Sequence, residues 1–340
     1  MPMIRPLLRK LILDIPRRDP KREHVRLPER KAEAVTIAAG FRFSEGVVVC
    51  ADTEMTDSVQ KFDSSKLMTF VIGGGESKYR ALSLVFALAG TVDYARMAIT
   101  QIEEAIAEEF LKAPESMTDK KIRNMVTASL LQFHEKFVFN HPLYRNGAGP
   151  VLELVIGAFS PCMGRTFLLC TRECAVNEIS NSACIGQGQS FARYIIQQFW
   201  KDRLNRYEVY MLAANVLEQT KQNAPNCGKN SQFIFIDQVT GRVEPIWGLR
   251  NQHVESYSNQ FMRLYPFLFY DLASAQKDFE TVFTELKPYA YGLWNYYHRQ
   301  RDAYEALERG MAEGQQELRR RREEAEKAKQ SASQTPTPGQ

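Results

Sequence analysis

Hydrophobic residues form short continuous runs in some segments of the chain and recur at every third or fourth position in others. Continuous runs bounded by turn residues are typical of buried strands, and helical spacing is typical of amphipathic helices. In the first half, the strand pattern occurs at 35–43, 46–52, 67–72 and 83–89, and the helical pattern follows at 93–112 and about 116–139. Ser116 or Thr118 can cap the second helix.

The same order recurs in the second half. Strands are predicted at 152–159, 165–171 and 183–186, helices at about 190–200 and 208–222, and a last strand pair at 231–237 and 243–247. Turns that contain Gly or Pro join neighbouring runs, which predicts antiparallel hairpins. We therefore expect an α+β fold, a four-layer αββα sandwich in which two antiparallel sheets pack face to face and are flanked by helices.

Composition divides the chain into four parts. Residues 1–33 combine five prolines with many Arg and Lys residues and predict a basic extension without a packed core. Residues 34–250 carry the strand and helix pattern and form the predicted domain. Residues 251–318 predict a helical C-terminal extension, and 319–340 predict a charged, disordered tail. The four arginines at 319–322 favour a solvated helix end over a nucleic-acid contact.

Charge and cysteine usage exclude several classes of function. Across 340 residues, 44 Lys plus Arg balance 40 Asp plus Glu, so the net charge of +4 does not indicate a nucleic-acid partner. The six cysteines include no CxxC pair and have no neighbouring histidines, so we expect no metal, no cofactor and no disulfide framework. Buried thiols indicate a reducing, cytoplasmic location. No run approaches the roughly 20 apolar residues that a membrane helix needs.

A hydroxyl, a carboxylate and an amine occur at the ends of the first three predicted strands, at Thr36, Asp52 and Lys66. If these strand ends meet at one edge, the three groups can form an activated nucleophile. The ordinary interpretation is simpler on spacing alone, because Thr is common in strands, Asp commonly ends them, and a Lys before a strand is usually solvated.

The stretch Thr36–Lys66 resembles the start of a proteasome β-type subunit, a member of the N-terminal-nucleophile hydrolases. The shared residues are Thr36, Gly40, Glu45 to Val49, Ala51 to Thr53, Thr56 and Ser65 to Leu67. Asp52 has the spacing from Thr36 that the family shows, whereas Lys66 comes two positions early. The blocks Ala89-Gly90-Thr91 and Gly186-Gln187-Gly188 resemble later family blocks, so the resemblance covers roughly residues 34–247.

The resemblance implies a catalytic role for Thr36, Asp52, Lys66 and Gly90. Cleavage before Thr36 would free an amine that accepts the proton of the attacking hydroxyl. Lys66 would favour the alkoxide, Asp52 would orient Lys66, and the Gly90 N–H would stabilise the oxyanion. The resemblance also implies a substrate site, in which Thr56 holds the substrate backbone and Met55, Met68 and Leu88 shape an apolar pocket.

The chain departs from the family pattern at four positions. Val35 replaces the glycine that precedes the catalytic threonine, and Gln187 replaces a supporting serine. Ala224 and Cys227 stand where the family has an acid and a second serine. These differences bear on both the removal of residues 1–35 and the support of the nucleophile.

Two functions therefore follow from the sequence. The first is a proteasome-like, threonine-type endopeptidase subunit, which hydrolyses unfolded proteins or peptides within a ring of copies of itself, and which allows an unfoldase as a further partner. The alternative is a non-catalytic proteasome-like structural or scaffolding protein. A third interpretation is an unrelated two-layer binding module with a helical tail that binds a partner.

Overall fold

The computed structural model describes residues 36–56, 61–73, 80–146, 149–225 and 227–246, together with scattered residues between 278 and 324. Its strands are β1 (Ala38–Phe43), β2 (Gly46–Asp52), β3 (Glu54–Thr56), β4 (Lys61–Asp63), β5 (Leu67–Ile72), β6 (Leu82–Gly90), β7 (Leu152–Ser160), β8 (Arg165–Arg172), β9 (Ala175–Ile179), β10 (Ser182–Ile185), β11 (Ser231–Asp237) and β12 (Val243–Ile246). Its helices are α2 (Val92–Lys112), α3 (Asp119–Phe133), α4 (Gln189–Phe199) and α5 (Arg206–Asn223). Short helical turns occupy Pro114–Ser116, His134–Val138 and Tyr144–Asn146.

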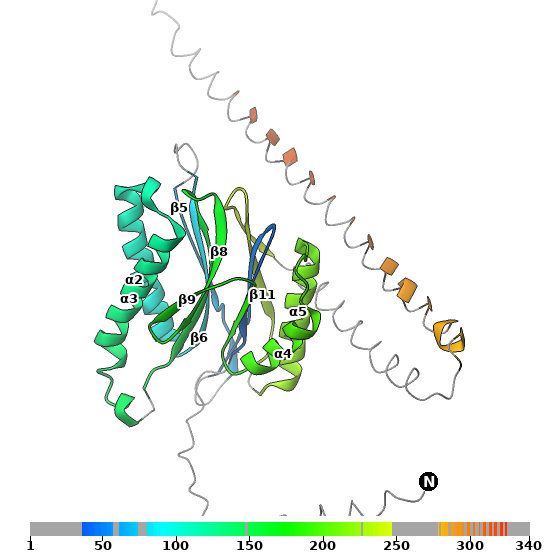
Figure 1. Cartoon of the computed structure of the whole chain (residues 1–340), viewed down its shortest axis with the longest axis horizontal. Helices are drawn as coiled ribbons and strands as arrows, with labels where there is room; N and C mark the ends of the chain where they lie inside the picture. The colour runs from blue at the N-terminus through cyan, green and yellow to red at the C-terminus, as the bar shows by residue number, and fades with distance from the viewer. Residues whose placement is uncertain are drawn as a thin grey trace, which may run out of the picture. The chain divides into compact units, whose positions relative to one another are not determined.

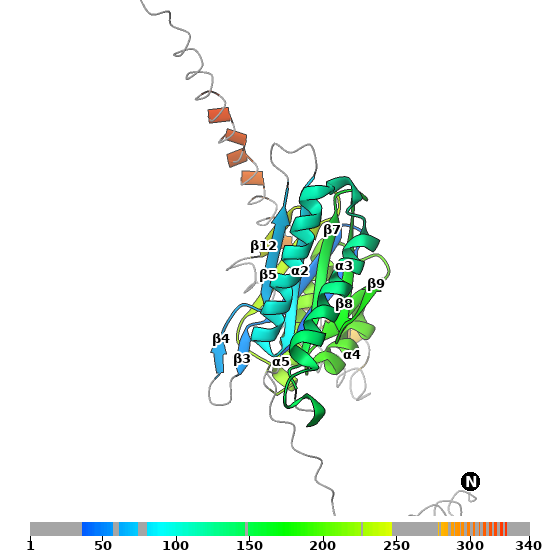
Figure 2. The same ribbon diagram turned by 90° about the vertical axis from the view of Figure 1, so that its left-hand side faces the viewer.

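The strands of the described residues form three sheets, and every strand pair is antiparallel (Figures 1 and 2). The sheet with strand order β10-β1-β2-β11-β12 is called the β2 sheet below, and the sheet with order β5-β6-β7-β8-β9 is called the β7 sheet. Strands β3 and β4 form a separate two-stranded ribbon. The predicted mixture of helices and antiparallel sheets is confirmed, but the expectation of only two sheets is wrong.

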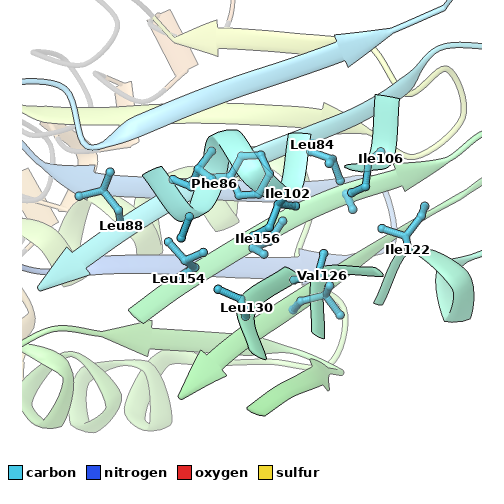
Figure 3. Packing of buried hydrophobic residues seen from close by; sticks show 14 of the residues in the cluster. Leu84, Phe86, Leu88, Ile102, Ile106, Ile122, Val126, Leu130, Leu154 and Ile156 are labelled. Atoms are coloured by element: carbon cyan, nitrogen blue, oxygen red, sulfur yellow. The ribbon is translucent and has the colours of Figure 1, made fainter. Parts of the chain in front are cut away.

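Three hydrophobic clusters explain why the apolar runs are continuous. Helices α2 and α3 cover one face of the β7 sheet, where residues such as Phe86, Ile102 and Val126 pack together (Figure 3). Helices α4 and α5 pack on the β2 sheet, and a third cluster fills the space between the two sheets. Strand β2 is buried throughout because Val48 faces the helices while Val49 faces the other sheet.

Two glycines allow the sheets to approach closely. A Cβ atom on Gly40 of β1 would lie 2.6 Å from Val155 and 2.7 Å from Leu168, both in the β7 sheet. A Cβ atom on Gly157 of β7 would lie 2.8 Å from Val49 in the β2 sheet. A larger side chain at either position would force the facing side chains, or the strands that carry them, to shift.

Helix boundaries follow local capping. Thr118 begins α3, as one of the two predicted caps, by accepting a hydrogen bond from Lys121 N. Asn205 and Glu208 form a reciprocal capping box at the start of α5, so this helix begins slightly earlier than predicted. The predicted helix over 116–139 is α3 followed by a π-helical turn at His134–Val138.

Several predictions lie wholly or mainly outside the described residues. These are the extension 1–33, the first part of the C-terminal extension and most of the charged tail. Every described residue from 280 onwards is helical. The proposed domain boundaries stay predictions. No helix within the described residues combines the length and apolar character that crossing a bilayer requires.

Candidate active site

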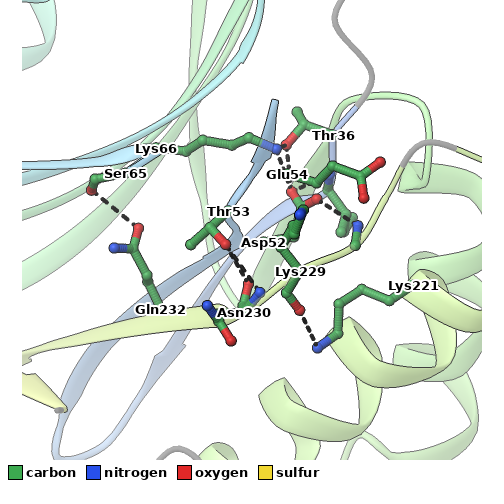
Figure 4. A network of polar contacts seen from close by, with 12 residues as sticks. Thr36, Asp52, Thr53, Glu54, Ser65, Lys66, Lys221, Lys229, Asn230 and Gln232 are labelled. Atoms are coloured by element: carbon green, nitrogen blue, oxygen red, sulfur yellow. Dashed lines mark hydrogen bonds and ion pairs between the residues drawn. The ribbon is translucent and has the colours of Figure 1, made fainter. Parts of the chain in front are cut away.

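The three predicted polar residues come together where β1 begins and β2 ends. These strands pair antiparallel with Ala38 opposite Ala51, so the residues before β1 lie beside the end of β2. Thr36 and Asp52 occupy these two places. Lys66 directly precedes β5 in the β7 sheet and reaches them from the facing sheet (Figure 4). The site is therefore built from both sheets.

The three side chains form one hydrogen-bonded cluster. Thr36 Oγ1 donates to Asp52 Oδ1 at 2.5 Å, and Lys66 Nζ donates to the same carboxylate oxygen at 2.7 Å. Lys66 Nζ also donates to Thr36 Oγ1. The exposed fractions are 2% for Thr36, 0% for Asp52 and 2% for Lys66. A hydroxyl is thus held between a cation and an anion, in a dry environment that strengthens both interactions.

The Asp52 carboxylate is anchored by the backbone as well. Ile37 N donates to Oδ1 at 3.1 Å, and Gly228 N donates to Oδ2 at 3.0 Å. Both oxygens of this buried anion are therefore hydrogen-bonded, which offsets the cost of removing it from water. The Gly228 contact comes from the main chain, so it does not depend on the acid and serine that the segment from Ala224 to Cys227 lacks.

Burial sets the electrostatics of the cluster. It lowers the pKa of the Lys66 ammonium below its ordinary value, and the Asp52 carboxylate opposes part of this shift. Burial also raises the pKa of the nearby Cys227 thiol to about 12, with the Asp52 charge adding to the rise. Cys227 is therefore a neutral thiol at physiological pH and does not compete with Asp52 for the lysine.

The Gly186-Gln187-Gly188 block lies against the backbone of Thr36. Gly188 N donates to the Thr36 carbonyl at 3.4 Å. Gly186 has φ +86°, and a Cβ atom there would lie 2.3 Å from the Thr36 carbonyl oxygen. Only glycine combines this backbone conformation with so close an approach. The block therefore positions Thr36 through its main chain, although Gln187 stands where the resemblance led us to expect a serine.

A narrow gap, called the pocket below, lies beside Thr36, and it holds no space for a molecule as large as water. Its lining consists of Thr36, Glu54, Met55, Lys66, Leu88, Ala89, Gly90 and Val92. Three of the predicted site residues, Met55, Leu88 and Gly90, therefore lie next to the cluster. The volume of the pocket, about 0 Å³ for a water-sized molecule, lies far below the roughly 300–1,000 Å³ that is typical of small-molecule sites.

The structure separates Met68 from this group. Met68 is partly buried and packs against the cluster beneath α2 and α3, and it is not among the residues that line the pocket. Thr56 lies in β3 with its backbone paired to Lys61, but its side chain falls outside the described residues.

Sequence reasoning missed Glu54 and the contribution of Gly228. Glu54 lines the pocket, is only 7% exposed, and its Oε1 lies 2.5 Å from Lys61 Nζ. A Cβ atom on Gly228 would meet Glu54 Oε2 at 2.4 Å, so this glycine makes room for the carboxylate. The available signal was the position of Glu54 two residues after Asp52, which places both on the same side of an extended chain.

A second set of hydrogen bonds ties the neighbouring segments together. Thr53 Oγ1 donates to the Asn230 carbonyl at 3.2 Å and accepts from Asn230 N at 3.0 Å. Ser65, adjacent to Lys66, donates to Gln232 Oε1 at 3.1 Å across the two sheets (Figure 4). These contacts hold the segments on which Asp52 and Lys66 lie. Among the described residues, no group of three or more His, Cys, Asp and Glu side chains is arranged to hold a metal ion.

Solved structures with a similar fold include Anbu proteins. Anbu from Hyphomicrobium sp. strain MC1 matches with a TM-score of 0.56 and 17% identity, over 72% of this chain and 99% of that chain. Anbu from Yersinia bercovieri, described as an ancestral beta-subunit, gives 0.54 and 12%, over 72% and 98%. The Anbu complex from Pseudomonas aeruginosa, described as a helical assembly, gives 0.53 and 11%, over 72% and 98%. No protein-family model matches the sequence, and no curated protein matches it either.

These neighbours correct the resemblance drawn from the sequence. The prediction of a proteasome β-type subunit as such is wrong, because the similar structures belong to Anbu, a family related to proteasomes but distinct from them. At 11% to 17% identity the similarity establishes the fold.

Proposed function

We propose that this chain is a subunit of a self-assembling, threonine-type hydrolase of the N-terminal-nucleophile class, with that class's four-layer αββα fold. Its substrates would be peptide bonds of unfolded proteins or peptides. The observation that carries the proposal is the contact of Thr36 Oγ1 with both Lys66 Nζ and Asp52 Oδ1 in a buried site. A threonine that only filled a strand would need neither charge.

In this proposal, residues 1–35 are removed by cleavage of the bond between Val35 and Thr36. A peptide nitrogen is not basic, whereas the free α-amine can accept a proton. The amine takes the proton of Oγ1 as the oxygen attacks the substrate carbonyl. The tetrahedral oxyanion collapses, the peptide C–N bond breaks, and the departing amine takes the proton. Water then hydrolyses the ester that remains on Thr36.

The surrounding residues have separate roles in this reaction. Lys66 stabilises negative charge on Oγ1, and Asp52 holds Lys66 in place. Gly90, which lines the pocket, would donate its N–H to the oxyanion, a contribution typically worth about 10²–10³ in rate. Met55 and Leu88 would contact the substrate side chain, and Thr56 its backbone.

Assembly and location complete the proposal. The Pseudomonas aeruginosa Anbu complex is described as a helical assembly, and we extend self-assembly to this chain, as a ring or a helix, with an unfoldase as a further partner. A reducing, cytoplasmic location is supported by the six cysteines, all of which are free thiols.

The second candidate is a non-catalytic scaffold of the same fold. The observation that favours it is the narrow pocket beside an almost fully buried Thr36. In that case the Asp52–Lys66 pair is an internal ion pair that holds the two sheets together, with no chemical role.

The intact mass of the purified protein separates the two candidates. The hydrolase requires a mature chain that begins at Thr36, together with turnover of an unfolded, labelled protein. Thr36→Ala should abolish both, Lys66→Ala should nearly abolish turnover, and Thr36→Ser should retain part of it. Thr166→Ala is the matched control, because Thr166 is also fully buried and hydrogen-bonded, to Gln238. A chain that keeps residues 1–35, assembles and shows no turnover supports the scaffold.

A further inference from the structure

A second cavity, of about 410 Å³, lies at the open edge of the two sheets and is separate from the Thr36 site. It is bounded by β8 and β9 of the β7 sheet, by β10 of the β2 sheet and by α4, and β9 and α4 can be followed in Figure 2. Both β9 and β10 are edge strands. The volume falls within the range of about 300–1,000 Å³ that is typical of small-molecule sites.

The strand register explains which side chains enter this cavity. Cys170 lies opposite Asn177, so these two residues and their next-but-one neighbours Arg172 and Ile179 share one face of the sheet. From α4, residues at i, i+3 and i+4 spacing complete the wall. The polar side chains that line the cavity are Arg172, Asn177, Ser182, Arg193 and Gln197.

The cavity is positively charged and lacks a neutralising group of its own. Neither Arg172 nor Arg193 has an ion-pair or hydrogen-bond partner among the described residues, and no carboxylate of those residues lines the cavity. By contrast, Arg42 and Arg123 share Glu178 of β9, at 3.6 and 3.9 Å.

The nearby groups leave the positive charge in place. Glu153 acts electrostatically on Cys170, but its carboxylate accepts a hydrogen bond from Gly186 N at 3.0 Å and does not line the cavity. Burial raises the pKa of the Cys170 thiol, and it raises that of Cys184 to about 12. The wall formed by the two cysteines is therefore neutral. A cleft of one sign with low-dielectric walls concentrates counter-ions.

We propose that this cavity binds an anion whose charged oxygens are presented as a carboxylate or a phosphate. The planar guanidinium groups of Arg172 and Arg193 would each offer a fork of N–H donors to those oxygens, which is the geometry that such anions favour. Asn177, Ser182 and Gln197 add neutral donors. The anion has two possible sources, a free small molecule or an acidic side chain of a second copy of this chain.

Titration of the full-length protein with inorganic phosphate and with succinate tests the proposal. Binding is measured by calorimetry at constant ionic strength set with sodium chloride. Each of Arg172→Gln and Arg193→Gln should weaken binding by about tenfold, and the double variant should abolish it. Arg145→Gln/Arg203→Gln, which removes two exposed arginines outside the cavity, should bind as the unchanged protein does. Arg172→Lys/Arg193→Lys keeps both positive charges but loses the paired N–H donors of the guanidinium groups, so it should bind with intermediate affinity.

Sedimentation velocity of the same variants identifies the source. If neither small anion binds, but the assembly dissociates in Arg172→Gln/Arg193→Gln and not in the control, the anion is supplied by a neighbouring copy. If binding is lost and assembly is unchanged, the anion is a free molecule. Equal binding in all variants, or no binding combined with unchanged assembly, overturns the proposal. None of these measurements depends on hydrolysis at Thr36.

Discussion

The ammonium of Lys66 and the guanidinium groups of Arg172 and Arg193 are all positive charges where the two sheets come together, but they differ in what neutralises them. Lys66 is 2% exposed and lies 2.7 Å from the Asp52 carboxylate, which is itself held by two backbone N–H groups. The two arginines are exposed and have no carboxylate beside them in the described residues. A buried cation needs an anion from the protein itself, because it has lost its water. Two exposed arginines remain hydrated and can bind an anion from solution or from another molecule. The first charge should therefore matter for stability, and the second for binding.

The largest expected effect comes from breaking the buried pair. Lys66→Met leaves the Asp52 carboxylate buried without its cation, so the free energy of unfolding should fall by about 3–5 kcal/mol. Asp52→Asn/Lys66→Met should cost less than the sum of the single substitutions, because it leaves no uncompensated charge. Urea unfolding of the four proteins measures this.

The exposed pair Lys112–Glu108 is the control for that experiment. Its atoms lie 2.5 Å apart, but the side chains are 61% and 69% exposed. Lys112→Met should therefore leave unfolding unchanged. If Lys66→Met is equally silent, Lys66 and Asp52 are not a buried pair in solution.

A smaller effect is expected at the glycine that supports Thr36. In Gly186→Ala, the new methyl group meets the Thr36 carbonyl in a backbone conformation that alanine disfavours, so stability should fall by about 1–3 kcal/mol. Gly164→Ala is the control, since Gly164 also has positive φ but its Cβ would lie 3.7 Å from its nearest neighbour, in Arg80. Thermal unfolding should show the larger loss for Gly186→Ala. An equal loss in both would mean that the close contact at Thr36 is relaxed at no cost.

The stability of the protein should also depend on pH through the Lys66 ammonium. The pKa of Lys66 is lowered in the folded protein, so between that value and the ordinary value of about 10.4 the unfolded chain binds more protons. The stability of the unchanged protein relative to Lys66→Met should therefore rise with pH in this interval, by at most about 1.4 kcal/mol per pH unit. Urea unfolding from about pH 7 to about pH 10 measures the trend, and Lys120→Met corrects for the loss of an exposed lysine. A relative stability that falls with pH would mean that Asp52 outweighs burial.

The smallest effect is expected at the cavity arginines. Because neither has a carboxylate partner in the described residues, Arg172→Gln and Arg193→Gln should each change the free energy of unfolding by no more than about 0.5 kcal/mol. At low salt, the double variant should be slightly more stable to unfolding than the unchanged protein, because it removes the repulsion between the two arginines, which is least screened there. Chemical denaturation at low and high salt checks this. A clear loss of stability would show that the arginines already have a structural partner.

The sequence predicted features that depend on local patterns and missed those that depend on distant contacts. Strand β2 was predictable because burial on both faces demands a continuous apolar run. Strands β3 and β4 have three residues each, and β4 is fully exposed, so they carry no apolar pattern. Thr36, Asp52 and Lys66 were found through the resemblance to a known family, whereas their spacing alone favoured an ordinary interpretation.

The second cavity was not predictable for a related reason. Arg172 lies in β8 of the β7 sheet, and Arg193 lies in α4, which packs on the β2 sheet. No rule of sequence spacing relates these two residues. Met68 was predicted to shape the pocket because of the family resemblance, but strand alternation sends its side chain toward the helices. Lys66 and Met68, which are close in the sequence, therefore point to different places, whereas Arg172 and Arg193, which are far apart in the sequence, line the same cavity.

The division of the Thr36 site between two sheets also has a mechanical consequence. Thr36 and Asp52 lie at strand ends of the β2 sheet and Lys66 directly precedes β5 of the β7 sheet, so a change in the spacing or offset of the two sheets changes the Lys66–Thr36 contact. Gly40 and Gly157, which face the opposite sheet, therefore help to set the distance between Lys66 and Thr36, because their lack of a side chain lets the two sheets pack closely. A methyl group added at either glycine should increase the spacing of the two sheets. Lys66 would then move away from Thr36 Oγ1, although the added methyl group contacts neither residue. The distance between the β2 sheet and the β7 sheet, more than the length of any loop, must therefore be maintained for Thr36, Asp52 and Lys66 to stay in contact.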